Sequence, residues 1–446
     1  MSHQVTCKGP VSRRGLIKST MAASLGYVLG RHFIPTAWAK DEVKKPGAAV
    51  KPNDKPSAAP AGYTVAKGKA NKVILMWMGG GPSHLDTFDP KPGTPQSGGV
   101  KGIEAADGFQ ISEKFPMLAK QGKYLQVLRG VQSREGDHGQ ASHLMHTGYR
   151  EQSGVAFPGI GSIVCAEAKD GPQSELPSYV ALNGGGWGPG LYGASYAPFS
   201  LGAGQQIPDL MAPMGAKTID ERRVLLTQLD LYYSRLNGSS LATEHQKTYE
   251  RAIKLSRSPL AKLFEIKGED QKKAEAYGPS GFGRACYVAK KLLTQGGVRF
   301  VEIDQGGWDT HAKADENTRN LCNQIDTPFA KLVEELAAEG QLDSTLIIWM
   351  GEFGRTPDLN AGAGRDHYPH CFSIAMAGGG IKGGTVVGKS NATGHEPDSK
   401  AIVVPDFFYS VCEACGIDPT KIRESADGRP IQVVDRGAKA VPGIFG

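Results

Sequence analysis

The sequence lacks a long apolar run and, in its main body, an excess of positive charge. No segment reaches the ~20 consecutive apolar residues that a membrane-spanning helix needs, so no transmembrane segment is expected. The 446 residues carry a net charge of +6. Residues 1–70 contain twelve lysines and arginines against three acids, so residues 71–446 carry −3. We therefore expect no nucleic acid as a partner.

Cysteines are few, and their spacing is not that of a small disulfide framework. Those that follow the N-terminal region are Cys165, Cys286, Cys322, Cys371, Cys412 and Cys415. Cys412 and Cys415 are three residues apart in an apolar helical stretch, which puts both on one face. They are interpreted either as two buried core thiols or as a disulfide formed after export.

Several strong catalytic motifs are also missing. Gly79–Ser83 follows an expected strand, but it lacks the last glycine of a dinucleotide-binding loop and contains Pro82. Gly378–Thr385 has a lysine, but Gly383 follows it where a P-loop needs Ser or Thr. Ser83 has no nucleophile-elbow glycines, and no H-E-x-x-H is present. Function must therefore be argued from scattered residues.

The N-terminal 70 residues are expected to lie outside the folded domain. Ser12–Lys18 contains paired arginines, a weakly apolar run follows, and Ala37–Ala39 supplies a small-x-small cleavage pattern. Residues 1–39 are thus interpreted as a Tat signal, which predicts a periplasmic or extracellular protein. Residues 40–70 are rich in Lys, Pro and Ala without periodicity, which predicts a disordered linker.

Strand-like and helix-like segments alternate along the remaining chain, residues 71–446. Apolar, β-branched runs predict strands at 72–78, 124–128, 177–182, 298–303, 345–350 and 372–377. Apolar residues at three-to-four spacing predict helices at 221–236, 241–264, 282–294, 316–338 and 406–415. The pattern predicts one α/β domain, a three-layer α/β/α sandwich with a mainly parallel sheet. A helical insertion is expected at about 205–295.

Polar side chains gather beside the expected strands. In mainly parallel sheets, functional residues lie at the carboxyl ends of the strands. Seven of the eleven histidines fall in segments next to these ends, which favours a site over random placement. The candidate residues in those segments are His84, Asp86, His138, Asp309, His311, Glu352, Arg355, Arg365, Asp366, His367 and His370.

Carboxylates and imidazoles at one edge of a sheet predict a bound cation. Uncompensated carboxylates in a partly buried cleft cost several kcal/mol each, and a divalent ion removes that cost. Mixed imidazole and carboxylate ligands suit transition metals better than Ca²⁺, so Zn²⁺ or Mn²⁺ is expected. Such an ion activates water or polarises an ester oxygen, and Arg355 or Arg365 is expected to neutralise the anion.

Each pair of candidates also has a local structural interpretation. Three such pairings remain open from the sequence: a cap of the following helix by Asp309 and His311, an ion pair on a turn between Glu352 and Arg355, and a hydrogen-bonded pair of Asp366 and His367.

Six segments resemble one bacterial family. They are MWMGGGPSHLDTFDPKPG, HLMHTGYR, GGWDTH, STLIIWMGEFGRTP, GRDHYPHCFSIAMAGGGIKGGTVVG and PDFFYSVCEACGIDPTK. The set resembles the domain of unknown function 1501 family, which is Tat-exported and placed in the alkaline phosphatase/sulfatase superfamily. The resemblance covers about residues 70–446 and implies the fold of that superfamily.

The resemblance also implies roles for single residues. GWDTH is similar to the Asp and His of the superfamily's first metal site, and His367 or His370 to its last histidine. In this comparison His138 occupies the position of the nucleophile, and Glu352 occupies the position of a metal-binding acid. Phe353 stands where a ligand histidine is expected. The resemblance therefore implies one metal site, and a second only if His84, Asp86 or Glu352 rebuild it.

The expected function is metal-dependent hydrolysis of a phosphate or sulfate ester. The substrate is expected to be a small anionic ester or a sulfated or phosphorylated glycan. The assigned residues are Asp309, His311, Asp366 and His367 for the metal, and His138, Glu352, Arg355 and Arg365 for catalysis, with His138 or a metal-bound water as the attacking group. The alternative is a non-catalytic relative that binds an anionic glycan or a partner protein in the same cleft.

Overall fold

The computed structural model describes residues 68–106, 108–168, 174–207, 216–237, 241–425 and 428–445. The signal expected at 1–39, and the linker expected at 40–70 up to residue 67, lie outside these residues and stay predictions. Within the described ranges, no helix is both long enough and apolar enough to cross a membrane.

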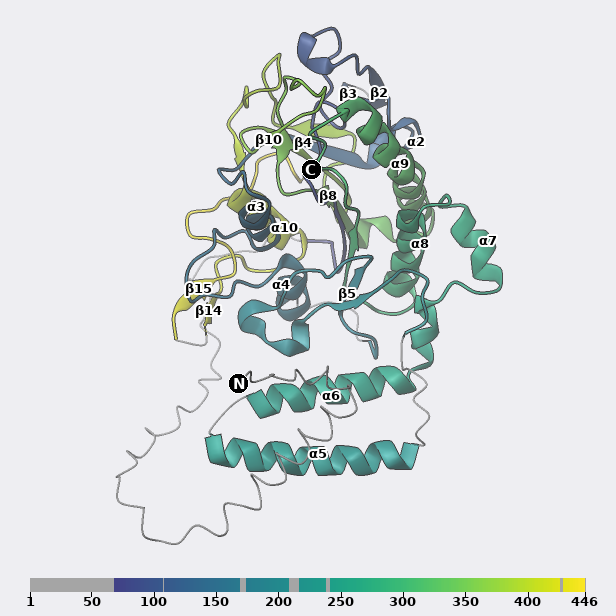
Figure 1. Cartoon of the computed structure of the whole chain (residues 1–446), viewed down its shortest axis with the longest axis vertical. Coiled ribbons are helices and arrows are strands. Elements are labelled where there is room, and N and C mark those ends of the chain that lie inside the picture. The colour runs from purple at the N-terminus through teal and green to yellow at the C-terminus, as the bar shows by residue number, and fades with distance from the viewer. Residues whose placement is uncertain are drawn as a thin grey trace, which may run out of the picture. The chain divides into compact units, whose positions relative to one another are not determined.

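A mainly parallel sheet of nine strands runs through the centre of the described chain (Figure 1). Its order is β12 (Thr385–Val387), β4 (Leu125–Gln132), β11 (Phe372–Gly378), β8 (Thr345–Met350), β1 (Lys72–Trp77), β7 (Phe300–Asp304), β5 (Tyr179–Leu182) and β6 (Phe199–Leu201), and β13 (Ile402–Val403) also pairs with β4. All pairs are parallel except the two that β11 makes.

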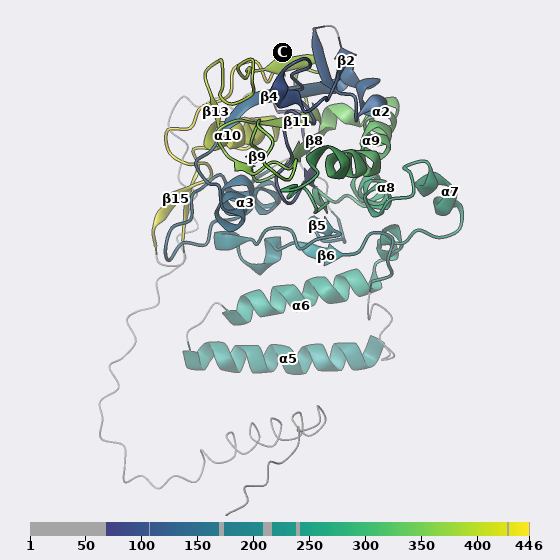
Figure 2. The same cartoon turned by 45° about the horizontal axis from the view of Figure 1, so that its top comes forward.

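Helices cover both faces of the sheet. Strands such as β1 carry apolar side chains on both faces, and both faces must therefore be buried. Ile74 and Met76 share a core with α2 (Pro116–Ala119), α8 (Gly281–Thr294) and α9 (Ala314–Ala338). Val73 and Leu75 share the opposite core with α3 (His138–Thr147), α4 (Ile160–Glu167) and α10 (Val404–Ala414). The two helical layers are seen on either side of the sheet in Figures 1 and 2. The predicted three-layer α/β/α sandwich is confirmed.

The helical region expected at about 205–295 has two parts. Helices α5 (Ala216–Asn237), α6 (Leu241–Arg257) and α7 (Glu269–Glu275) follow one another, and α5 contacts α6. Helix α8, by contrast, buries most of its side chains in the core on the sheet. Leu255, Phe264 and Ala274, which precede α8, belong to the same core, and the predicted bounds of the insertion stay a prediction. Three two-stranded sheets lie outside the central sheet: β2 (Gly102–Ala106) with β3 (Phe109–Ser112), β9 (Gly354–Arg355) with β10 (His367–Tyr368), and β14 (Ile422–Glu424) with β15 (Pro430–Gln432).

The direction of β11 decides which segments meet at the edge of the sheet. Because β11 is antiparallel to β4 and β8, it begins at the edge where those two strands end. The segment before β11, Gly364–His370, therefore lies beside the segments that follow β4, β7 and β8. The sequence predicted this strand but not its direction.

The six cysteines of the described chain are buried free thiols. Burial raises the pKa of the Cys415 thiol to about 12. Of the two interpretations of Cys412 and Cys415, the structure shows the core thiols.

Candidate metal centre

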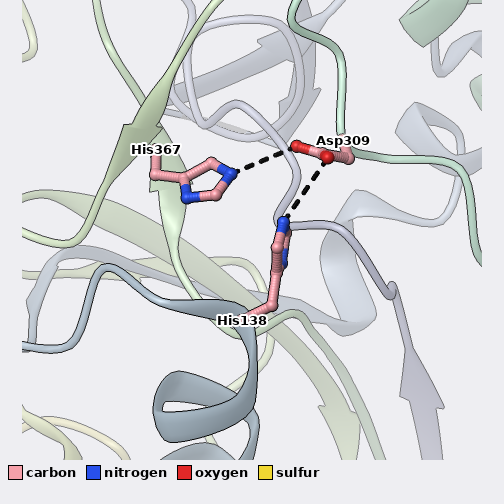
Figure 3. Close-up of side chains that lie close together, drawn as sticks. All are labelled: His138, Asp309 and His367. Carbon is pink, nitrogen blue, oxygen red and sulfur yellow. Dashed lines mark hydrogen bonds and ion pairs between the residues drawn. The ribbon is translucent and has the colours of Figure 1, made fainter.

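Three side chains from separate segments converge at the carboxyl edge of the sheet (Figure 3). One ligand atom each of His138, Asp309 and His367 lies within 4.8 Å of the others. Asp309 Oδ2 is 3.5 Å from His138 Nε2, and Asp309 Oδ1 is 3.3 Å from His367 Nε2. The three side chains are 45%, 40% and 27% exposed in the order Asp309, His138, His367, so solvent reaches them. Two imidazoles and one carboxylate are a donor set that fits Zn²⁺ or Mn²⁺ with positions left open.

His138 owes its position to the start of α3. The side chain of Asp137 caps the helix by accepting hydrogen bonds from Gly139 N and Gln140 N. His138 is therefore the first helical residue, and its Nδ1 lies 2.8 Å from Glu352 Oε1. Glu352 follows β8, is 3% exposed and also accepts a hydrogen bond from Gly80 N. The carboxylate thus fixes the ring so that Nε2 faces Asp309.

Replacing Glu352 with glutamine is expected to weaken metal binding by roughly 10–100-fold, the usual effect of losing a carboxylate behind a ligand histidine. The amide keeps the shape and an acceptor oxygen, so the fold should persist. Mn²⁺ titration of the metal-depleted protein measures the effect. Glu334→Gln, on the exposed face of α9, is the matched control; equal affinities of the two variants would contradict the role given to Glu352.

The turn Gly306–His311 is held by packing at both ends. Trp308 is 1% exposed, and its ring lies 5.8 Å from that of Trp349 in an edge-on contact. Gly80 has φ +115°, and a Cβ there would lie 2.4 Å from Asp309 N. Only glycine therefore lets the turn after β1 approach the turn after β7 closely enough to place Asp309.

His311 lies beside the group of three ligands. Its Nδ1 is 2.7 Å from Asp366 Oδ1, and its Nε2 is 3.0 Å from Asp309 Oδ1 and 3.1 Å from His367 Nε2. Asn360 ties this arrangement together, because its Nδ2 donates to both His311 O and Asp366 Oδ1. Asp366 therefore orients His311 and lies outside the group of His138, Asp309 and His367.

Arg355 is fully buried against Asp309. Its Nη2 donates to Asp309 Oδ1, and its other donors reach backbone carbonyl groups. Burial by itself raises the pKa of Asp309, but the hydrogen bond and charge of Arg355, together with His311 and His138, hold that pKa below its usual value. In the structure the guanidinium of Arg355 faces protein oxygens, and the expected binding of a substrate anion by Arg355 stays a prediction.

Three other candidates belong to buried networks away from the cluster. Asp86 Oδ1 is 3.0 Å from Lys114 Nζ, and Asp86 Oδ2 is 2.8 Å from Arg365 Nε. Arg365 Nη2 donates to Gln96 O, and the expected role of Arg365 as an anion binder stays a prediction. His84 Nε2 lies 2.8 Å from Gly394 O, and burial lowers the pKa of His84 to about 4.

The last candidate, His370, is exposed and lies against the ring of Tyr368, with ring centroids 5.2 Å apart. Of the alternatives His367 and His370, the structure therefore brings His367 to the centre.

Reasoning from the sequence missed Asn360, which carries no chemical signal in a polar loop, and treated Phe353 only as a lost ligand. The Phe353 ring packs against both histidines: its centroid lies 4.6 Å from that of His367 and 5.1 Å from that of His138.

A second group of acidic residues lies on β7. In the sequence it is indicated by Glu302, an acid inside an otherwise apolar strand. Glu302 Oε1 is 3.2 Å from His146 Nε2, and Tyr179 donates to Glu302 Oε2. Two residues on, burial and the charge of Glu302 raise the pKa of Asp304 to about 7, against the opposing effect of His146.

The raised pKa of Asp304 predicts a pH-dependent stability. The folded state holds this proton more tightly than the unfolded state, so stability falls as pH rises from about 4 to about 7. Asp304→Asn removes the penalty. It is expected to raise the free energy of unfolding by about 1–3 kcal/mol at pH 8, and by little at pH 4. Urea unfolding at both pH values tests this, and an equal effect at both would contradict it.

Comparison with known proteins adds the family. A family model described as "Protein of unknown function (DUF1501)" matches residues 70–445. A search of curated proteins found no match. Among solved structures, the chain is similar to Ps i-CgsB in complex with k-i-k-neocarrahexaose, with 14% identity, 78% of this chain and 73% of that chain covered, and a TM-score of 0.38.

Two further solved structures are similar at the same low level. One is the alkaline phosphatase from the Antarctic bacterium TAB5, with 13% identity, coverage of 71% of this chain and 94% of that one, and a TM-score of 0.31. The other is the lipoteichoic acid synthase LtaP from Listeria monocytogenes, with 8% identity, coverage of 82% and 77%, and a TM-score of 0.37. At these values the similarity says nothing about the chemistry of the site. The family match spans nearly the whole described chain, and the protein belongs to the DUF1501 family.

Proposed function

We propose that the protein hydrolyses a phosphate or sulfate ester with a divalent metal ion held by His138, Asp309 and His367. The observation that carries the proposal is the convergence of these three ligand atoms within 4.8 Å at the open edge of the sheet. A divalent ion bound there would act as a Lewis acid on an ester oxygen and activate water for attack.

The surrounding residues support water as the attacking group. Both ring nitrogens of His138 are committed, Nδ1 to Glu352 and Nε2 toward Asp309, so the ring has no free nitrogen for attack. His311 is 46% exposed, but its Nδ1 is held by Asp366 and its Nε2 lies 3.0 Å from Asp309 Oδ1, so both of its ring nitrogens are engaged as well.

The substrate class and location belong to the same proposal. A small anionic ester, or a sulfated or phosphorylated glycan, is the substrate that a cationic metal centre would attract. Export by the Tat pathway to the periplasm or beyond is proposed from Ser12–Lys18 and Ala37–Ala39.

Removal of the metal tests the proposal directly. The purified protein is expected to contain Zn or Mn by elemental analysis and to hydrolyse a generic aryl phosphate or aryl sulfate. Dialysis against a chelator should abolish this activity, and Zn²⁺ or Mn²⁺, but not Ca²⁺, should restore it. A metal-free protein that is inactive on both esters with every ion would contradict the proposal.

One observation favours a second candidate, a non-catalytic protein that binds an anionic glycan or a partner. Neither Arg355 nor Arg365 faces the open site, so neither is placed to stabilise the negative charge that develops during ester hydrolysis. This candidate predicts binding of a sulfated oligosaccharide that survives chelation, with no ester hydrolysis. Calorimetric titration with and without chelator separates the two functions.

A further inference from the structure

The metal centre contains a cation of its own, the guanidinium of Arg355. The Arg355 side chain has 0% exposure although Asp309 beside it is 45% exposed. In the β9–β10 pair, Arg355 is directly opposite His367, which places the guanidinium next to the ligand group. A buried arginine at the rim of a metal site needs a reason, because like charges repel in a partly buried environment.

The oxygens around Arg355 resemble the shell of a hard cation. Nε donates to Gly81 O at 2.9 Å, Nη1 to Arg365 O at 3.1 Å, and Nη2 to Gly80 O and Asp309 Oδ1. Three carbonyls and one carboxylate, from three separate segments, thus converge on one charged group. Carbonyl and carboxylate oxygens are also the ligands that ions such as Mn²⁺ accept.

Asp309 shares Oδ1 between this cation and two histidines, His311 Nε2 at 3.0 Å and His367 Nε2 at 3.3 Å. Oδ1 takes the hydrogen bond from Arg355, while Oδ2 faces His138 Nε2 at 3.5 Å (Figure 3). An additional ion on the Oδ1 side would have to displace the guanidinium.

The charges of the cluster lead to the same conclusion. The carboxylates of Asp309, Glu352 and Asp366 contribute −3, and Arg355 contributes +1. The balance of −2 matches one divalent ion, whereas two ions would leave +2 in a site that is partly shielded from water.

We propose that Arg355 is a fixed cation of the metal centre, which limits it to one divalent ion and holds Asp309 Oδ1, so that Asp309 Oδ2 faces His138. This inference rests on the proposed metal site. It adds the number of ions that the site holds and the residue that limits this number. Arg355 is a positioning residue, since four of its five N–H groups bind protein oxygens and Nη1 also lies 3.5 Å from His311 Nε2.

Metal stoichiometry tests the inference on the full-length, metal-depleted chain. Titration with Mn²⁺, followed by elemental analysis and electron paramagnetic resonance, is expected to give one ion per chain with no spin coupling. Two coupled ions would overturn this inference and leave the proposed function standing. No bound ion would overturn both.

A variant then asks whether the charge of Arg355 is what matters. Arg355→Ala opens the shell of four oxygens and is expected to raise the Mn²⁺ stoichiometry from one to two. Excess free guanidinium should return it to one, whereas NaCl at the same ionic strength should not. Arg319→Ala, an exposed arginine on α9, should stay at one ion throughout. A folded Arg355→Ala protein that still binds one ion, without any effect of guanidinium, would overturn the inference; if the variant does not fold, the wild-type stoichiometry decides.

Discussion

Asp309→Ala is expected to abolish metal binding and to reduce ester hydrolysis by roughly 10³-fold or more, because a metal supplies several kcal/mol of transition-state stabilisation. Asp309 makes polar contacts with both of the other residues, through Oδ2 with His138 and through Oδ1 with His367, whereas the two imidazoles contact each other ring against ring. Its loss therefore leaves two imidazoles without the carboxylate that joins them. Elemental analysis and an aryl ester assay measure the effect.

Two further variants make this result specific. Asp309→Asn keeps the oxygen that accepts from Arg355 but loses the charge, so it should lose metal as Asp309→Ala does while losing less stability. Asp398→Ala is the matched control, because Asp398 is 50% exposed and pairs only with Lys389 at the surface. An Asp309→Ala protein with full metal content and activity would end the assignment of the site.

The largest expected effect on stability comes from Asp86, which reasoning from the sequence had placed in the cleft. Asp86→Ala is expected to lower the free energy of unfolding by about 3–5 kcal/mol, the usual cost of leaving a buried charge unpaired. The Asp86 side chain is 2% exposed, and its partners Lys114 and Arg365 are 0% and 1% exposed. The variant leaves the buried guanidinium of Arg365 without its carboxylate, while Lys114 keeps only the exposed carboxylate of Asp315. Urea unfolding at neutral pH measures the change, and Asp398→Ala should stay within about 0.5 kcal/mol of the wild type.

The same variant has a defined pH dependence. Burial alone would raise the pKa of Asp86. The charges of Arg365 and Lys114 lower the pKa by more than burial raises it, so the net pKa is below its usual value. The carboxylate therefore stabilises the fold at neutral pH, and this contribution is lost as pH falls through the folded-state pKa. The stability gap between wild type and Asp86→Ala should narrow in acid. A gap that is constant from neutral to acidic pH would contradict the charge argument.

The local pairings that the sequence left open are all replaced by long-range ones. Asp309 and His311 do not cap α9, whose N-cap residue is Lys313 without a side-chain cap. Glu352 bonds to His138 and Arg355 to Asp309, so the expected ion pair between neighbours does not form. Asp366 bonds to His311 from the other turn, and not to its neighbour His367.

The buried network shows why residue type and strand position did not suffice. Asp86 and His84 follow β1 as a site residue would, but a distant segment covers them: Gly394 O lies against His84, and Ser390 donates to neighbouring Asp89. Arg365, next in sequence to Asp366, turns into the protein toward Asp86. A charge beside a strand end is catalytic or structural according to what folds over it, and one-dimensional spacing does not contain that information.

The sequence by itself determined the elements, the layers and the pool of chemical groups, because apolar periodicity reports burial and glycines report tight turns. Six expected strands and five expected helices have counterparts in the described chain, with ends that differ by a few residues or a short 3₁₀ turn. Only the tertiary structure decided that β11 runs backwards, that His367 joins His138 and Asp309, and that Arg355 turns inward. Those outcomes depend on contacts between residues far apart in the chain, where the balance of desolvation and pairing selects partners that no local pattern specifies.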